Sequence, residues 1–197
     1  MSGSNHLHVE RHPWKPFLPH NAKLLMLGSF PPKPERWSME FYYPNFQNDM
    51  WRVVGLVFFD DPERFADKSA RRFKYDDIVA FCAERGIALA DTALEAVRLK
   101  DNASDQFLDV VTAISPETLL EPLPQCRIVA ATGQKAAELF AASTGFVPPA
   151  VGLSCTFSWN QRDFTFFRMP STSRAFPKPL AQKAVFYRQL FRQAGLL

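Results

Sequence analysis

The sequence predicts an α/β protein in which helices cover both faces of a mostly parallel sheet. Short, almost entirely apolar segments, which are typical of buried strands, alternate along the chain with segments that have the apolar spacing of helices. Proline and glycine residues mark the expected ends of several of these helices. In sheets of this kind, ligands bind at the carboxyl ends of the strands.

Four strands are expected. The first two are the apolar runs 23–29 and 87–94. The run 126–133 is the third strand, and the second arm of a hairpin within 157–170 is the fourth. Loops that carry polar and aromatic residues leave the ends of the first, second and fourth strands, and these loops hold the candidate site residues.

Helices are expected between these strands. Two helices are expected to begin at a cap residue followed by proline. Asp61 and Ser115 are typical N-caps, and Pro62 and Pro116 stand at the first helical position. Gly86 is a typical helix terminator. The segment 105–114 is ambiguous. The expected helices span 48–59, 60–72, 75–86, 115–123, 134–142 and 179–195.

The length and composition indicate one domain. The 197 residues can bury a sizeable core, because 47% of them are apolar. We expect residues 1–21 to form an extended arm and residues 22–197 to form the domain. No apolar run approaches the roughly 20 residues of a membrane span, and the N-terminal stretch has no apolar segment of the kind found in secretory signals. These features favour a cytoplasmic protein without a membrane partner.

Cysteine and histidine are distributed in a way that argues against several kinds of site. The three cysteines make no CxxC pair, which excludes a zinc ribbon or a cysteine-ligated cluster and suits a reducing compartment. All four histidines lie within residues 1–20, so a catalytic triad or a histidine-based metal site would have to recruit the arm. We therefore expect chemistry based on amides, hydroxyls, carboxylates and backbone groups, without a metal or other cofactor. The net charge of +3 permits a nucleic-acid partner.

The loop after the first strand combines glycine, aromatic and amide residues. Gly28 and Ser29 let a ligand approach the backbone, where N–H groups can receive developing negative charge. The adjacent Tyr42 and Tyr43 suit stacking on a flat group better than core packing. Asn48 stands where a helix begins, and its position alone favours an N-cap.

The other two loops add a carboxylate and a group of hydroxyls. Asp91 ends an apolar strand, so its side chain points into any site formed there; capping the next turn is an equally good interpretation. The loop after Met169 suits a phosphate clamp, because it combines small hydroxyl residues with backbone N–H groups, but an ordinary Ser/Thr turn fits it too. The clamp candidates are Pro170, Ser171, Thr172, Ser173 and Arg174.

Together and in this order, two of these loops resemble the motifs of the uracil-DNA glycosylase superfamily. The "GSFP" of 28–31 is similar to its Gly-x-x-Pro loop after the first strand, and the "PSTS" of 170–173 is similar to its Pro-Ser-rich loop after the last. The branch that includes hypoxanthine-DNA glycosylases looks closest. There, a Tyr-Tyr pair and then Asn-x-aromatic-Trp follow "GSFP"; the matching residues are Tyr42, Tyr43, Asn48 and Trp51, with Met50 in the aromatic place. Segments 103–108 and 132–136 also resemble that branch, so the similarity covers nearly the whole chain.

The resemblance implies a three-layer α/β/α sandwich with a central four-stranded parallel sheet. It also implies a monofunctional DNA glycosylase of base-excision repair, which hydrolyses the N-glycosidic bond of a damaged, deaminated base flipped out of DNA. The expected partner is DNA containing such a base, and the expected state is a monomer.

The resemblance also implies a role for each candidate residue. Asn48 would hold the water that attacks the sugar C1′, and Tyr43 would stack on the flipped base. Backbone N–H groups near Ser29 and Phe30 would stabilise charge on the departing base. Asp91 would read the edge of the base, and because a carboxylate only accepts hydrogen bonds, it would discriminate weakly among deaminated bases unless burial keeps it protonated. The 170–173 loop would grip phosphates, and Arg174 would press into the gap left by the flipped nucleotide.

The sequence departs from the superfamily pattern at several positions. No Asp lies between Gly28 and Pro34, Met169 stands where the uracil enzymes have a His, and Arg174 and Phe176 replace an expected Pro and Asn. Two alternatives therefore stay open: a catalytically weak or inactive nucleic-acid-binding protein of the same fold, and a hydrolase of free nucleosides or nucleotides.

Overall fold

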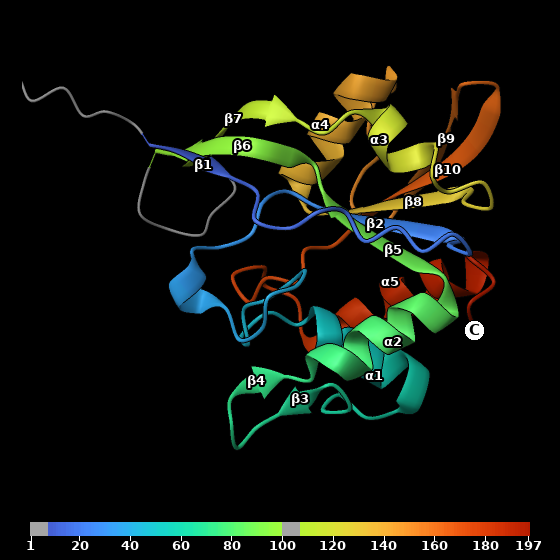
Figure 1. Ribbon diagram of the computed structural model, residues 1–197. Coiled ribbons are helices and arrows are strands. Elements are labelled where there is room, and N and C mark those ends of the chain that lie inside the picture. Colours follow the sequence, from blue (N-terminus) through green and yellow to red (C-terminus); the bar gives the residue numbers. More distant parts are fainter. Residues whose placement is uncertain (1–7, 100–106) are drawn as a thin grey trace, which may run out of the picture.

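The computed structural model describes residues 8–99 and 107–197, and these residues form a layered α/β fold. A twisted central sheet lies between two groups of helices (Figure 1). Most of the "ASDQFL" segment at 103–108 lies outside the described residues. None of the helices in the described residues is long and apolar enough to cross a membrane.

The central sheet has five strands, in the order β5, β2, β8, β10, β9. Their bounds are Ile87–Asp91 (β5), Leu24–Gly28 (β2), Ile128–Thr132 (β8), Arg162–Met169 (β10) and Ser154–Trp159 (β9). The first four are mutually parallel, and β9 pairs antiparallel with β10. The expectation of a four-stranded parallel sheet is therefore corrected to a five-stranded mixed sheet. The first arm of the predicted hairpin joins as β9, because Asn160 and Gln161 adopt positive φ angles of 47° and 59° in the tight turn.

Helices cover both faces of this sheet. On one face lie α1 (Met50–Phe59), α2 (Tyr75–Arg85) and α5 (Leu180–Gln193); on the other lie α3 (Pro116–Leu120) and α4 (Gln134–Thr144). Each face has its own buried apolar cluster: Trp51, Phe65 and Phe191 belong to the first, and Phe140 and Phe166 to the second. The three-layer arrangement follows from these two clusters, since each of the four parallel strands buries side chains on both faces, whereas β9 contributes only to the second cluster.

Local sequence signals explain most helix ends. Gly86 ends α2 in the left-handed conformation, with φ of 71°. The hydroxyl of Ser115 accepts a hydrogen bond from Thr118 N and caps α3. The helix predicted for 60–72 is wrong: this segment forms turns and the short strands β3 (Ala66–Asp67) and β4 (Arg72–Phe73). The Asp67 carboxylate accepts hydrogen bonds from Ser69 and Ala70, which stabilises a turn in place of a helix.

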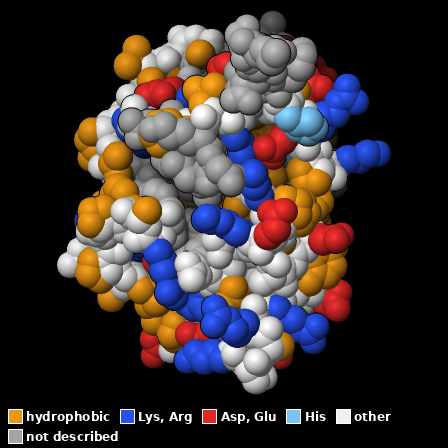
Figure 2. Space-filling model, turned by 90° about the vertical axis from the view of Figure 1, so that its left-hand side faces the viewer, with side chains coloured by type: hydrophobic (Ala, Val, Ile, Leu, Met, Phe, Trp, Pro, Cys, Tyr) orange, Lys and Arg blue, Asp and Glu red, His pale blue; other side chains and the backbone are white. Residues whose placement is uncertain are grey.

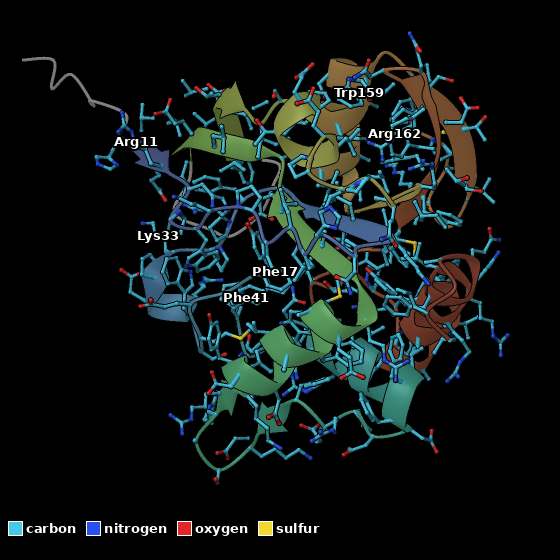
Figure 3. All side chains as sticks on the ribbon, turned by 45° about the vertical axis from the view of Figure 1, so that its right-hand side comes forward. Arg11, Phe17, Lys33, Phe41, Trp159 and Arg162 are labelled. Carbon is cyan, nitrogen blue, oxygen red and sulfur yellow. The ribbon has the colours of Figure 1, made fainter. Side chains whose placement is uncertain are left out.

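A second, three-stranded sheet attaches the N-terminal arm to the domain. It contains β1 (Val9–Arg11), β6 (Ala93–Arg98) and β7 (Leu108–Ala113), so most of the described part of the ambiguous segment 105–114 is a strand. The predicted strand 87–94 is divided at Thr92 between β5 and β6. Further along the arm, the backbone of Phe17 exchanges two hydrogen bonds of 2.9 Å with Leu89, and its ring meets Phe41 edge-on at 5.4 Å (Figure 3). The division of the chain at residue 21 stays a prediction, but the described part of the arm packs closely on the domain.

Candidate active site

A pocket of about 590 Å³ lies at the carboxyl edge of the central sheet. It is of the size usual for small-molecule sites, which is about 300–1,000 Å³. The face that carries these loops is shown in Figure 2, where Lys and Arg side chains gather around its middle. The predicted residues that line the pocket are Gly28, Ser29, Phe30, Tyr43, Asn48, Asp91, Ser171, Thr172, Ser173 and Arg174.

One predicted residue does not line the pocket. Pro170 is buried, and its carbonyl oxygen accepts a hydrogen bond of 3.0 Å from the Tyr187 hydroxyl. Pro170 therefore supports the loop from behind, and contact with a phosphate falls to the residues that follow it.

Gly28 and Asp91 form the floor of the pocket. They are register partners at the ends of the parallel strands β2 and β5, so their side-chain positions are adjacent. A Cβ atom at Gly28 would overlap Asp91 Oδ1. The glycine thus leaves the space that the carboxylate occupies, and the Thr92 N–H and hydroxyl fix the floor by donating to Gly28 O at 2.9 and 3.1 Å.

We expect Gly28→Ala to destabilise the protein by about 1–3 kcal/mol, the usual cost of overpacking. The new methyl group has to displace the Asp91 carboxylate, so ligand binding in the pocket should fall as well. Thermal denaturation measures the first effect. The double variant Gly28→Ala/Asp91→Ala is the control, since it removes the overlapping oxygen and should regain part of the lost stability. Equal melting temperatures for wild type and Gly28→Ala would contradict the close contact.

His12 reaches the pocket floor from the N-terminal arm. Its Nε2 lies 2.9 Å from Asp91 Oδ2, and its side chain is only 4% exposed. The ring lies among three aromatic side chains: it stacks on Tyr42 and meets Trp14 and Phe30 edge-on. The sequence led us to expect no histidine at the site. The structure corrects this expectation, because the arm places His12 in contact with the predicted site residue Asp91.

Tyr43 and Thr132 form the wall next to the floor. Thr132 ends β8, and its hydroxyl donates to Leu27 O at 3.2 Å. The Tyr43 hydroxyl, 2.9 Å from Thr132 Oγ1, is then the donor of that pair. Burial raises the pKa of the Tyr43 phenol well above its ordinary value, so the group keeps its proton and its role as a donor. Tyr42, in contrast, is a core residue at 2% exposure and does not suit stacking on a ligand.

Asn48 lies on the pocket wall, in the turn before α1. Its Oδ1 accepts a hydrogen bond of 2.9 Å from Met50 N, so the amide satisfies an N–H group of the first helical turn. Among the described residues, no hydrogen-bond partner exists for its Nδ2, which remains available to a ligand. Arg52 steadies this turn, since its guanidinium donates to Phe46 O at 2.7 Å and lies 4.6 Å from the Phe46 ring. The N-cap position expected for Asn48 belongs to Asp49, and Asn48 stands just before it, so Asn48 caps α1 only through this one bond, which is compatible with ligand contact.

A buried ion pair holds the hydroxyl loop against this turn. Lys183, on α5, has a side chain 1% exposed; its Nζ lies 2.8 Å from Asp49 Oδ2 and donates to Ser173 O at 3.0 Å. The backbone N–H of Asp49 donates to Thr172 O at 2.9 Å. These bonds place the loop 171–174 beside Asn48, so one ion pair positions two walls of the pocket.

Three arginines bring positive charge to the rim of the pocket. Arg174 and Arg36 are exposed, and Arg98 is largely buried. Arg98, from β6, donates to Glu10 at 2.9 and 3.1 Å and to Pro31 O at 2.6 Å, and its guanidinium lies 5.5 Å from the Phe30 ring. Arg98 thus fixes the loop that follows Gly28, whereas Arg174 is 59% exposed and free to meet an anion, its nearest carboxylate atom being 3.9 Å away on Asp49.

The sequence interpretation missed His12, Thr132 and Arg98. Thr132 had a usable signal, since it ends a strand at the same edge as Gly28 and Asp91. Arg98 and His12 had none, because their positions depend on the pairing of β1 with β6. Within the described residues, no group of three or more His, Cys, Asp or Glu side chains is placed to hold a metal ion.

Comparison with known proteins supports the fold. No protein-family model matches this sequence, and no curated protein matches it either. Among solved structures, the chain is similar to the solution NMR structure of a protein from Methanosarcina acetivorans described as a "putative Uracil DNA glycosylase". The two share a TM-score of 0.64 and 21% sequence identity, over 95% of this chain and 99% of the other. At this identity the likeness is one of fold alone.

Proposed function

We propose that this protein is a monofunctional DNA glycosylase that removes a deaminated base flipped out of DNA. The observation that carries the proposal is the convergence of an amide, a carboxylate, a tyrosine and a hydroxyl loop on one pocket at the carboxyl edge of the sheet. A flipped base needs a closed pocket with polar groups for its edge, while its flanking phosphates need donors at the rim. The likeness of fold to the described glycosylase adds support.

The proposed reaction is attack of water on C1′ of the sugar. The bond from the water oxygen to C1′ forms, the bond from C1′ to the base nitrogen breaks, and its electron pair leaves with the base. The water loses one proton, which ends on the released base. Asn48 holds the attacking water through its free Nδ2 and the remaining lone pair of Oδ1. Backbone N–H groups in the loop after Gly28 face the base and stabilise its developing negative charge.

Base recognition is assigned to Asp91 and Tyr43. Asp91 Oδ1 lies on the pocket floor above Gly28, where it can accept from a ring N–H of the base. The Tyr43 ring lines the adjacent wall and offers a face or an edge to the base plane. On another wall of the same pocket, Ser171, Ser173 and Arg174 suit the phosphates next to the flipped nucleotide.

Substitution of Asp91 by Asn should shift the base preference toward uracil. An Asn amide donates to one carbonyl and accepts from the adjacent ring N–H, which matches the uracil edge, whereas Asp accepts only. Rates of base release from uracil- and hypoxanthine-containing oligonucleotides give the ratio for wild type and variant across pH 5 to 8. If both proteins show equal rates on both substrates, Asp91 has no role in reading the base.

DNA binding should weaken moderately with salt. Few cations reach the rim, so we expect log affinity to fall against log salt concentration with a slope of about −2 to −4. Arg174→Gln should make the slope shallower by roughly 1 unit, because one phosphate contact is lost. The control is Arg192→Gln, which changes an exposed arginine on α5. An affinity that does not vary with salt would argue against DNA as the partner.

The decisive test is a panel of oligonucleotides that carry uracil, hypoxanthine, xanthine or an alkylated base, scored for alkali-labile strand breaks. Release of a free base from at least one of them is the expected result. Binding without release would favour the inactive nucleic-acid-binding alternative, and reaction only with the free nucleosides would favour the monomer hydrolase.

A further inference from the structure

We infer that His12 determines base selection by holding Asp91 so that a single oxygen, Oδ1, faces the pocket as a hydrogen-bond acceptor. This inference rests on the proposed function and extends it to a residue of the N-terminal arm. His12 is a positioning residue in this scheme: it contacts Asp91 and not the base. The selected base is then one that presents a ring N–H at this point, as the deaminated bases hypoxanthine and uracil do.

The arm holds His12 in place by several independent contacts. On one side, β1 pairs with β6 and His12 N donates to Leu94 O at 2.7 Å. On the other, Phe17 pairs with Leu89 next to Asp91 on β5, and the Tyr42 hydroxyl donates to Lys15 O at 3.1 Å. Ordering a histidine this closely beside a carboxylate costs conformational entropy, which argues that the contact has a use.

The contact with His12 occupies one oxygen of the Asp91 carboxylate, Oδ2. His12 Nδ1 lies 2.8 Å from Trp14 O and 3.2 Å from Trp14 N, so the ring can carry a proton on either nitrogen or on both. If Nε2 carries a proton, it donates to Asp91 Oδ2. If Nδ1 alone carries one, Nε2 accepts the proton of an Asp91 carboxylic acid at Oδ2. In both of these arrangements the shared proton lies between Nε2 and Oδ2, and Oδ1, which carries no proton, is left as an acceptor.

The free oxygen is directed toward the pocket. Oδ1 would overlap a Cβ atom added at Gly28, which also lines the pocket, and no hydrogen bond within residues 8–99 and 107–197 ends on this oxygen. Without His12, the buried Asp91 has no such restriction, because its carboxylate can rotate and turn Oδ1 out of line with the ring N–H of the base. His12 therefore excludes bases that present a bare ring nitrogen, because two acceptors then face each other.

The test compares hypoxanthine, whose N1 carries a hydrogen, with unsubstituted purine, whose N1 is an acceptor of the same size. Both are placed in single-stranded oligonucleotides on 2′-fluoro sugars, which resist glycosidic cleavage, and affinity is measured by fluorescence anisotropy. Wild type should prefer hypoxanthine by about 10-fold or more, the scale of one hydrogen bond to a charged group. His12→Phe keeps the ring packing and removes the hydrogen bond, so its preference should fall to about 2-fold or less.

Four further variants separate positioning from packing. His12→Gln restores a donor and should recover most of the preference. His20→Gln changes an exposed histidine of the same arm and should behave as wild type. In an Asp91→Ala background, His12→Phe should have no further effect, and His12→Ala serves as the second donor-free variant if His12→Phe does not fold.

Specific results overturn the inference. They are a wild type without preference, a His12→Phe variant that keeps the wild-type preference, or equal losses in His12→Phe and His12→Gln. Base release from the matched deoxyribose oligonucleotides is measured in parallel. Absence of release with an intact binding preference overturns the proposed function alone, whereas release with an unchanged preference in His12→Phe overturns only the role of His12.

Discussion

Asn48→Ala is expected to lower the rate of base release by about 10²–10⁴-fold, the usual contribution of a group that positions or activates water. No carboxylate among the residues that line the pocket is placed on the same wall, since Asp91 lies on the floor and is bonded to His12. DNA affinity should change little, because the phosphate contacts that we propose lie on the neighbouring loop. Single-turnover rates and binding constants, measured separately, distinguish the two effects.

Two controls separate catalysis by Asn48 from its role in the helix turn. Asn48→Asp keeps an oxygen that can accept from Met50 N, so it should melt at the wild-type temperature, whereas Asn48→Ala loses about 1 kcal/mol of capping. Gln47→Ala removes an exposed amide from the same turn and should leave the rate unchanged. Near-wild-type turnover in Asn48→Ala would show that this residue only caps α1.

Lys183→Met should have the largest effect on stability, a loss of about 3–5 kcal/mol, because it leaves the Asp49 carboxylate without its main partner. This is a large part of the roughly 5–15 kcal/mol that stabilises a typical domain. The loop 171–174 also loses the bond to Ser173 O, so affinity for DNA should fall in any protein that still folds. Chemical denaturation followed by tryptophan fluorescence measures the free energy of unfolding.

The double variant Asp49→Asn/Lys183→Met tests the cause of that loss. Removing both charges avoids an unpaired buried ion, so the double variant should be more stable than Lys183→Met alone. Arg192→Met, on the exposed side of α5, should change the free energy of unfolding by less than about 0.5 kcal/mol. If Lys183→Met and Arg192→Met behave alike, the ion pair does not hold the loop.

Much of the fold could be predicted because apolar strands and helix caps are local signals. The strand Leu24–Gly28, the cap at Ser115 and the terminator at Gly86 each follow from a few adjacent residues. The false helix at 60–72 depends on turns whose geometry short polar sequences specify weakly. Helix propensity was a poor guide there, because the Asp67 side chain satisfies backbone groups in another way. The hairpin within 157–170 was predicted, but the place of its first arm, Ser154–Trp159, in the central sheet was not.

The position of the candidate site could be predicted from the sequence, but the hydrogen bonds between its residues could not. The rule that parallel strands present their carboxyl ends at one edge brought Gly28, Asp91 and the loop after Met169 together, and all reach the pocket except Pro170. The roles assigned to these residues stay predictions. The pairing of His12 with Asp91 depends on an antiparallel contact between distant segments, which no local pattern reports.

The long sequence separations across the pocket have a consequence for folding. His12 and Asp91 are 79 residues apart, Tyr43 and Thr132 are 89 apart, and Asp49 and Lys183 are 134 apart. Each contact closes a long loop. The chain therefore loses the conformational entropy of that loop before the contact stabilises the fold. Helices and the first strand pairs can therefore form in a collapsed intermediate while the pocket is still open. Recovery of ligand binding during refolding should lag behind recovery of helical circular dichroism, and the lag would report the final docking of the arm and of α5.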